Sequence, residues 1–243
     1  MEDSRDRSAE GLHICQLSKR FGRLTAIDNV SFTVRRGEVL GIIGPNGAGK
    51  TTLLECLAGM LPADAGSVES GGQPLDAAGR VRSLFYLPDA ITPWPAQTVS
   101  WALRFAVGFL GGRSNDVHDV MRDLDLWPLV DQRIGTLSKG QRKRAVLAVG
   151  LLAPQGILIS DEPFDGLDLR QTRAVGAALR RRAAGGRTLI LSIHQIDDAA
   201  RVCDRFVLLS GGRVCGEGTV EELAGRAGAA APPNLAEVFL ALT

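Results

Sequence analysis

Long apolar runs, an excess of charge of one sign and clustered cysteines are all missing from this sequence of 243 residues. The longest apolar run, Ala145 to Leu152, is far shorter than the roughly 20 residues that a helix needs to cross a bilayer. The N-terminus, Met1 to Glu10, is charged and lacks the apolar segment of a secretory signal. We therefore expect a soluble protein that reaches a membrane only through a partner.

Charge and cysteine content exclude further classes of protein. The 28 basic and 27 acidic side chains leave a net charge of +1, so there is no excess of positive charge to neutralise phosphates, and we expect no nucleic-acid partner. Hydrophobic residues make up 45%, which is too many for a disordered chain. The four cysteines lack C-x-x-C spacing, which favours reduced core thiols in a cytoplasmic protein over a metal or redox site; they are Cys15, Cys56, Cys203 and Cys215.

Short apolar runs that alternate with helical patterns predict an α/β fold with a parallel sheet. Alternating apolar and polar residues indicate strands between Leu12 and Val39, and a turn-rich stretch follows from Pro62 to Gly79. Further strands are expected at 39–43, 157–159, 188–192 and 206–209. Helices are expected at 52–58, 170–182 and around 196–203.

The segment from Thr98 to Ala153 has apolar residues at helical rather than strand spacing. With helices expected at 116–126 and 139–152, this block is a helical insertion between the early and the later strands of the sheet. Near the C-terminus, Thr219 to Glu222 has the pattern of a capping box that opens a short helix. An Ala/Gly/Pro-rich linker at 225–233 and a last amphipathic helix at 235–243 complete the chain.

A glycine-rich segment between an expected strand and an expected helix matches G-x-x-x-x-G-K-[ST]; its residues are Gly44, Pro45, Asn46, Gly47, Ala48, Gly49, Lys50 and Thr51. Its glycines let backbone N–H groups turn toward phosphate oxygens, and the helix that begins at Gly49 directs its positive end at the anion. Lys50 adds a charge for the β- and γ-phosphates, Thr51 offers a hydroxyl to Mg²⁺, and we include Thr52, the next residue, in the nucleotide site. The alternative is a glycine-rich turn with an exposed lysine.

Two adjacent carboxylates, Asp161 and Glu162, follow the apolar strand expected at 157–159. Strand alternation places their side chains on different faces. Asp161 is therefore expected to approach the Mg²⁺ shell, while Glu162 faces a water in line with the γ-phosphate. Taken alone, the pair is better explained as an acidic turn after a strand, and the glycine-rich segment upstream favours the metal and water roles.

The segment Leu137-Ser138-Lys139-Gly140-Gln141 resembles the LSGGQ signature of the ATP-binding cassette (ABC) ATPases. The other family motifs occur in the expected order, with Phe21 at the aromatic A-loop position, Asp89 at the Q-loop position, Phe164 to Asp168 as the D-loop and His194 as the switch histidine. The resemblance spans about 12–218. It implies a P-loop NTPase core with a mostly parallel sheet, an N-terminal antiparallel β subdomain and an inserted helical signature subdomain.

The resemblance also implies a domain organisation. A flexible charged tail covers 1–10, and the ABC ATPase domain covers 11–218. The helical subdomain covers about 90–155 of that domain, and a short C-terminal helical extension covers 219–243.

By this resemblance, Phe21 stacks on adenine, and the alternative is a phenylalanine of the core or a hairpin edge. Ser138, Gly140 and Gln141 of the signature face the γ-phosphate bound by another copy, which implies a head-to-tail dimer with two ATP molecules between the copies. Asp168 bridges that interface. His194 contacts the γ-phosphate, and the alternative is a structural histidine with its hydrogen bonds satisfied. Together with Lys50 and Glu162, His194 completes the expected catalytic set.

Two residues depart from the family pattern. Lys139 replaces the first glycine of the signature's glycine pair, a position that varies in the family. Asp89 stands where the family has glutamine. A carboxylate can reach Mg²⁺ or its water, so Asp89 joins Thr51 and Asp161 as an expected metal ligand, although its side chain is shorter and charged.

Three functions fit the resemblance. The first is the ATP-hydrolysing subunit of a transporter, bound to the inner face of the membrane through a separate transmembrane permease. Residues 86–95 and 235–243 resemble ABC-2-type exporters, and Trp94 either seats the permease or packs within its own helical subdomain. The second is a soluble ABC ATPase, for example in metal-cluster assembly. The third is an ATP-gated regulatory module, which the carboxylate of Glu162 disfavours because a pure switch needs no base.

Overall fold

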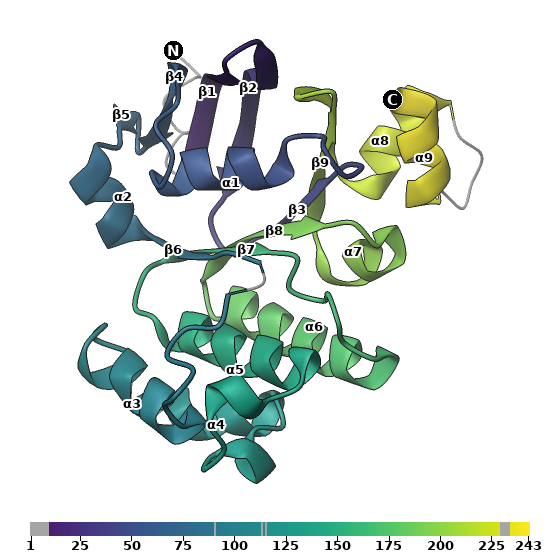
Figure 1. Cartoon of the computed structure of the whole chain (residues 1–243). Coiled ribbons are helices and arrows are strands. Elements are labelled where there is room, and N and C mark those ends of the chain that lie inside the picture. The colour runs from purple at the N-terminus through teal and green to yellow at the C-terminus, as the bar shows by residue number, and fades with distance from the viewer. Residues whose placement is uncertain (1–9, 90, 113, 115, 229–233) are drawn as a thin grey trace.

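The computed structural model describes residues 10–89, 91–112, 114, 116–228 and 234–243. The expected charged tail, apart from Glu10, lies outside these residues, as does the part of the expected linker at 229–233. The chain builds two sheets with helices between and below them (Figure 1).

The first sheet is antiparallel and has the strand order β2-β1-β4-β5. Its long hairpin joins β1 (Glu10–Phe21) to β2 (Leu24–Arg35). The stretch expected to be turn-rich instead contains β4 (Ala65–Ser70), β5 (Gln73–Pro74) and the start of α2 (Ala77–Ser83). The strand β4 carries a single buried apolar side chain, Val68 opposite Ile14, so pairing with β1 stabilises a segment whose own pattern is weak.

The second sheet has six strands in the order β10-β9-β3-β8-β7-β6. The strands β3, β6, β7, β8 and β9 run parallel, and β10 runs antiparallel to β9. The bounds are β3 Val39–Ile43, β6 Leu84–Leu87, β7 Ile157–Asp161, β8 Thr188–Ile193, β9 Arg205–Ser210 and β10 Arg213–Gly218. The mostly parallel α/β sheet is therefore confirmed, whereas β6 and β10 were not expected from the sequence.

Alternate residues of the parallel strands belong to two separate cores. Leu158 and Leu189 pack with the helices on one face, while Ile159 and Ile190 pack with α1 (Lys50–Ala58) and the antiparallel sheet on the other. Figure 1 shows α1 between the two sheets and the large helices on the far side. A strand buried on both faces reads as a continuous apolar run, which is why these strands are visible in the sequence.

The helical insertion lies below the six-stranded sheet in Figure 1. It comprises α3 (Val99–Gly108), α4 (Asp116–Asp123), two short 3₁₀ turns (Trp127–Leu129 and Ile134–Thr136) and α5 (Lys139–Leu152). The bounds of α5 are those expected, while α4 ends three residues early. Trp94 packs within this subdomain, with ring-centroid distances of 5.6 Å to Trp101 and 4.9 Å to Phe105.

The remaining helices complete the cover of the sheet. They are α6 (Leu169–Ala184), α7 (Ile196–Val202), α8 (Val220–Ala227) and α9 (Leu235–Leu242). The helix α8 begins with the expected capping box and extends into the stretch expected to be a linker. Leu235 and Val238 of α9 are buried in the core of the helical face. Across the described residues, the helices are all too short or too polar to cross a membrane.

Candidate functional site

The loop between β3 and α1 is shaped for an anion. Gly49, directly before α1, has φ of 100°, and a Cβ there would lie 2.4 Å from the carbonyl oxygen of Ala26. Only glycine fits this close approach in the left-handed region. Among the described residues no side chain caps α1, so its first backbone N–H groups remain available to a phosphate.

Lys50 holds a positive charge over this loop. Its side chain is 7% exposed, and Nζ donates to the carbonyl oxygens of Gly44 at 2.8 Å and Pro45 at 3.3 Å. The same ammonium lies 3.8 Å from Oε1 of Glu162. A nearly buried ammonium held mainly by carbonyls has capacity for a further anionic partner.

Asp161, at the end of β7, is 2% exposed. One carboxylate oxygen accepts from the Thr51 hydroxyl at 2.8 Å, and the other accepts from the Ser192 hydroxyl. Thr51 and Asp161 thus place a hydroxyl and a carboxylate side by side. Hard oxygen donors of this kind suit Mg²⁺, so the residues fit the expected cation.

The direction of the Glu162 side chain is set by its own backbone conformation and not by strand alternation. The strand ends at Asp161, and Glu162 has φ of 48°, a left-handed conformation that a non-glycine residue adopts at some cost. Its N–H donates to the Ser192 hydroxyl at 2.9 Å, which holds the turn. The two carboxylates have different partners, but both line the same cavity, and strand alternation does not apply to Glu162 because the strand ends before it.

The structure brings Glu162 and His194 together. Oε2 of Glu162 lies 2.5 Å from Nδ1 of His194 and accepts from the His194 backbone N–H at 3.2 Å. His194 follows β8, the strand next to β7 in the sheet. The carboxylate therefore lies between the ammonium of Lys50 and an imidazole.

A cavity of about 600 Å³ lies against Lys50, Asp161 and Glu162, whereas Gly44, Pro45 and His194 are not among its lining residues. Of the expected residues it is lined by Phe21, Asn46, Gly47, Gly49, Lys50, Thr51, Thr52, Asp89, Asp161 and Glu162. Phe21 is 48% exposed, and the Lys19 ammonium lies 5.8 Å from the centre of its ring. Ala48 is buried beneath the loop.

Two walls of the cavity were missed by sequence reasoning. One is the segment 24–26 at the start of β2, and the other is the Gly211–Gly212 turn between β9 and β10. The Gly-Gly pair between two strands is a hairpin signal that could have been used. Ser192, which bonds Asp161 and Glu162, was also missed, and a serine at the end of an apolar strand carries no such signal.

Asp89 faces the same cavity but already has a partner. One of its carboxylate oxygens lies 2.5 Å from Nζ of Lys143, on α5. The residue at the Q-loop position is therefore joined by charge to the helix that follows the signature.

The signature residues lie outside the cavity, at the start of α5. The Ser138 hydroxyl accepts from the backbone N–H of Gln141, and the Gln141 side chain accepts from the N–H of Ser138 at 2.9 Å. The side chain of Gln141 is thus part of a cap. A Cβ on Gly140 would lie 2.8 Å from the carbonyl oxygen of Gly166, so the signature packs directly on the D-loop of its own chain.

The D-loop carries two more polar contacts. Lys139 lies 2.6 Å from Asp165, and its hydrogen bond holds the pKa of that carboxyl below the usual value. Asp168 caps α6 by accepting from the backbone N–H of Gln171 at 2.8 Å. Within one chain, therefore, the signature and D-loop residues form a second cluster outside the cavity lining. They are Ser138, Gly140, Gln141 and Asp168.

Comparison with known proteins agrees with this arrangement. The family model described as ABC transporter matches residues 27–165. The Nod factor export ATP-binding protein I of Ralstonia nicotianae is 34% identical over 222 residues, covering 89% of this chain and 68% of that protein. The protein of the same name from a Rhizobium species is 33% identical, covering 89% of this chain and 73% of that protein.

Solved structures extend the similarity to the whole fold. The structure of an ATP-binding subunit of an ABC transporter has a TM-score of 0.85 at 28% identity, and the match covers 95% of this chain and 98% of that chain. An ATP-binding cassette in its ADP conformation has a TM-score of 0.77 at 25% identity.

Proposed function

The chain belongs to the ABC transporter family as an ATP-binding, ATP-hydrolysing subunit, and from this premise we propose that it drives export through a separate transmembrane permease. The observation that carries the hydrolytic part of the proposal is the meeting of Lys50, Glu162 and His194 beside the start of α1, which no side chain of the described residues caps. We further propose 11–218 as the ATPase domain, with its helical subdomain at about 90–155 and the C-terminal extension at 219–243.

Nucleotide binding is assigned to the cavity of about 600 Å³. The phosphates lie against the loop 44–49 and the N–H groups of Lys50 to Thr52, where backbone donors and the helix dipole act together. Phe21 is the proposed adenine platform, because its half-exposed ring lies at the same cavity as the loop. Stacking on such a ring contributes roughly 1–3 kcal/mol per base.

Magnesium is assigned to Thr51 and Asp161, with Asp89 as a further candidate. The hydroxyl and carboxylate are already 2.8 Å apart, and Asp89 faces the same space. When bound, the cation supplies charge for the phosphate oxygens. Asp161 keeps its orientation through Ser192, so the oxygen that faces Thr51 is held in place.

Hydrolysis is assigned to Glu162 and His194. Glu162 accepts a proton from the attacking water, and the neighbouring Lys50 and His194 hold this carboxylate in its orientation. His194 Nδ1 lies at the carboxylate, which leaves its other ring nitrogen for the terminal phosphate. Most of the catalysis is then positioning and charge stabilisation.

A second copy of the chain is the proposed partner across the nucleotide. Ser138, Gly140 and Asp168 lie outside the cavity of their own copy, at the N-termini of α5 and α6. A head-to-tail dimer would place the start of α5 over the nucleotide of the other copy, where its backbone donors meet an anion. Such a dimer closes when ATP binds and opens after hydrolysis.

A chain of contacts supports coupling from the nucleotide to the helical subdomain. Asp89 faces the cavity and pairs with Lys143 of α5. A few residues on, Trp94 packs against Trp101 and Phe105 of α3. We propose that movement of this segment carries the state of the nucleotide to the permease, which docks on the helical subdomain. The alternative permease seat at Trp94 itself is disfavoured by its packing within the subdomain.

Export is the direction that the relatives favour, because the first matches bear names of export ATP-binding proteins. Two other functions are separated by measurement. An ATP-gated regulatory module would bind ATP without turnover, whereas an ABC ATPase outside transport, as in metal-cluster assembly, would hydrolyse ATP without co-purifying with a polytopic membrane protein. We expect both turnover and such a partner.

The deciding experiment is Glu162→Gln. It keeps the size of the side chain and removes the base, so ATP binding should persist while turnover falls about 10²- to 10⁴-fold. Sizing chromatography with ATP and Mg²⁺ should then show a trapped dimer. The matched control is Glu222→Gln in the capping box of α8, which should hydrolyse ATP at the normal rate. Normal turnover in Glu162→Gln would contradict the assignment of the base.

A further inference from the structure

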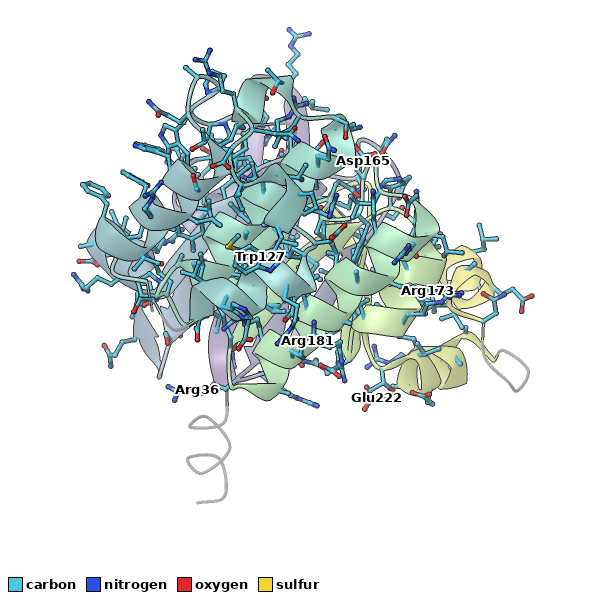
Figure 2. All side chains as sticks on the ribbon, turned by 90° about the horizontal axis from the view of Figure 1, so that it is seen from below. Arg36, Trp127, Asp165, Arg173, Arg181 and Glu222 are labelled. Atoms are coloured by element: carbon cyan, nitrogen blue, oxygen red, sulfur yellow. The ribbon has the colours of Figure 1, made fainter. Side chains whose placement is uncertain are left out.

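A second cavity, of about 260 Å³, lies where the strands β7 and β8 begin. Asp161 and His194 lie at the opposite ends of these strands. The walls of the cavity are the end of α5 with the loop 153–156 before β7, the last turn of α6 with the loop 185–187 before β8, and Asp116 at the start of α4. The cavity therefore belongs to neither the nucleotide site nor the signature cluster. Figure 2 looks up at this side of the molecule and labels Arg181 on α6.

One guanidinium in this cavity has an unsatisfied edge. Arg187 donates from Nη1 to the carbonyl oxygen of Leu151 at 2.8 Å. Its Nε and Nη2 are buried and find no hydrogen-bond partner in the described part of the chain. These two nitrogens direct parallel N–H bonds to one side, which is the geometry that grips two oxygens of a carboxylate or a phosphate.

The charges around the cavity leave a positive excess. Arg181, Arg182 and Arg187 line it. Asp116 pairs with Arg182 at 2.9 Å and Asp123 pairs with Arg181 at 2.9 Å, so among the described residues Arg187 is the arginine here that has no carboxylate partner. Burial, with a further contribution from Arg182, lowers the pKa of Arg187 to about 10. A buried cation without an anionic partner is costly, so an anion that enters here is stabilised.

An unsatisfied acceptor faces the same space. Oε1 of Gln155 is buried without a partner among the residues described, while its Nε2 donates to the carbonyl oxygen of Val81 at 3.3 Å. Orphaned buried donors and an orphaned acceptor at one cavity call for a ligand or ordered water. A group with two acceptor oxygens and one hydroxyl donor carries the complementary partners for these three atoms.

We propose that this cavity binds a small hydroxyl-bearing anion, a phosphate or a 2-hydroxycarboxylate, on the Nε–Nη2 edge of Arg187 with its hydroxyl on Gln155. Because both nitrogens are covered in this structure, entry requires a lining side chain to move. Gln155, held by a long hydrogen bond, is the side chain that we assign to this movement. The loops that carry Gln155 and Arg187 lead directly into β7, which ends at Asp161, and β8, which ends at Ile193 just before His194.

The test is calorimetric titration of the full chain with inorganic phosphate and, separately, with malate. A saturating non-hydrolysable ATP analogue with Mg²⁺ is present throughout, so that the nucleotide cavity is filled. We expect at least one of the two anions to bind once per chain, and the stronger one identifies the natural ligand class. If neither binds, the cavity holds only water and the proposal is wrong.

Two variants locate the binding. Arg187→Lys keeps the charge and removes the paired Nε–H and Nη2–H donors. We expect the affinity for the anion to fall at least about tenfold. Gln155→Glu supplies a carboxylate from the chain itself, and it should abolish anion binding even if Arg187→Lys proves unstable. Arg173→Lys, an exposed arginine on the same α6 (Figure 2), is the matched control and should bind normally. Unchanged binding in either of the first two variants overturns the assignment.

Discussion

The N-termini of the helices α1 and α5 differ in whether a side chain caps them. The helix α1 begins after Gly49, and no side chain within the described residues caps it. The helix α5 begins after Ser138, where a full capping box already occupies side chains and backbone donors. The nearby lysines differ in the same way. Lys50 is held mainly by loop carbonyls, whereas Lys139 is paired with Asp165 at 2.6 Å.

The difference indicates what each end has left to offer a ligand. At α1, backbone donors and an ammonium converge on one cavity, so this end alone can hold an anion strongly. At α5, the side chains already serve the chain's own structure. Its contribution to nucleotide binding must then come from the remaining backbone donors and depends on a second copy to bring a phosphate there.

The strongest test of this contrast is Lys50→Ala compared with Lys139→Ala. Removing Lys50 should weaken ATP binding by about 10- to 150-fold, since a hydrogen bond to a charged group contributes roughly 1.5–3 kcal/mol. Removing Lys139 should leave the affinity of the isolated chain unchanged. Fluorescence titration with a labelled nucleotide measures both. Equal losses in the two variants would erase the distinction between the helix ends.

A smaller effect is expected for Ser138→Ala compared with Thr219→Ala. Both remove the hydroxyl of a capping box, so each should lower the free energy of unfolding by about 1 kcal/mol. Only Ser138→Ala should also slow ATP turnover, because α8 contributes no residue to the lining of the proposed nucleotide cavity. Urea unfolding and a phosphate-release assay separate the two effects. If Thr219→Ala slowed turnover equally, stability alone would explain both.

The residues around α1 are predictable from the sequence because their chemistry is local. A glycine-rich loop between an apolar strand and a helix can hardly be built another way, and Lys50 and Thr51 follow at fixed positions within it. The bounds of α5 are likewise predictable from Ser138 and the apolar run that ends at Leu152. The motif order also predicts that Glu162 and His194 lie at neighbouring strand ends.

What the sequence does not predict depends on partners distant in the chain. The strand β4 forms by pairing with β1, and the Gly211–Gly212 turn becomes a cavity wall only when Gly212 bonds to the backbone of Ala48 and Asp28. The left-handed backbone of Glu162 is set by Ser192, 30 positions away. The pairs Lys139–Asp165 and Lys143–Asp89 join residues that no local pattern connects.

Asp89→Asn and Lys143→Met sharpen the contrast at the border between the two regions. If Asp89 contributes to metal binding, Asp89→Asn should raise the Mg²⁺ concentration needed for half-maximal turnover by a few-fold, with Kd for ATP nearly unchanged. Lys143→Met frees the carboxylate and should shift the Mg²⁺ requirement in the opposite direction. An unchanged Mg²⁺ dependence in both variants would remove Asp89 from the metal site.

The smallest expected effect concerns pH at the α5 end. The pKa of Asp165 lies below its ordinary value of 3.8 because Lys139 donates a hydrogen bond to it, and the pKa of Lys139 is raised in return. A depressed carboxyl pKa contributes stability that is present above the unfolded value and is lost as the pH falls through the folded one. A raised lysine pKa contributes stability that is present below 10.5 and is lost as the pH rises through the folded value.

In Lys139→Gln the carboxyl of Asp165 should therefore titrate closer to 3.8, which carboxyl NMR measures directly. The exposed Arg170→Gln on α6 is the control and should leave that titration unchanged. A carboxyl that still titrates low without Lys139 would assign the shift to the helix ends instead of to the ion pair, and the two N-termini would then differ less in charge than their contacts indicate.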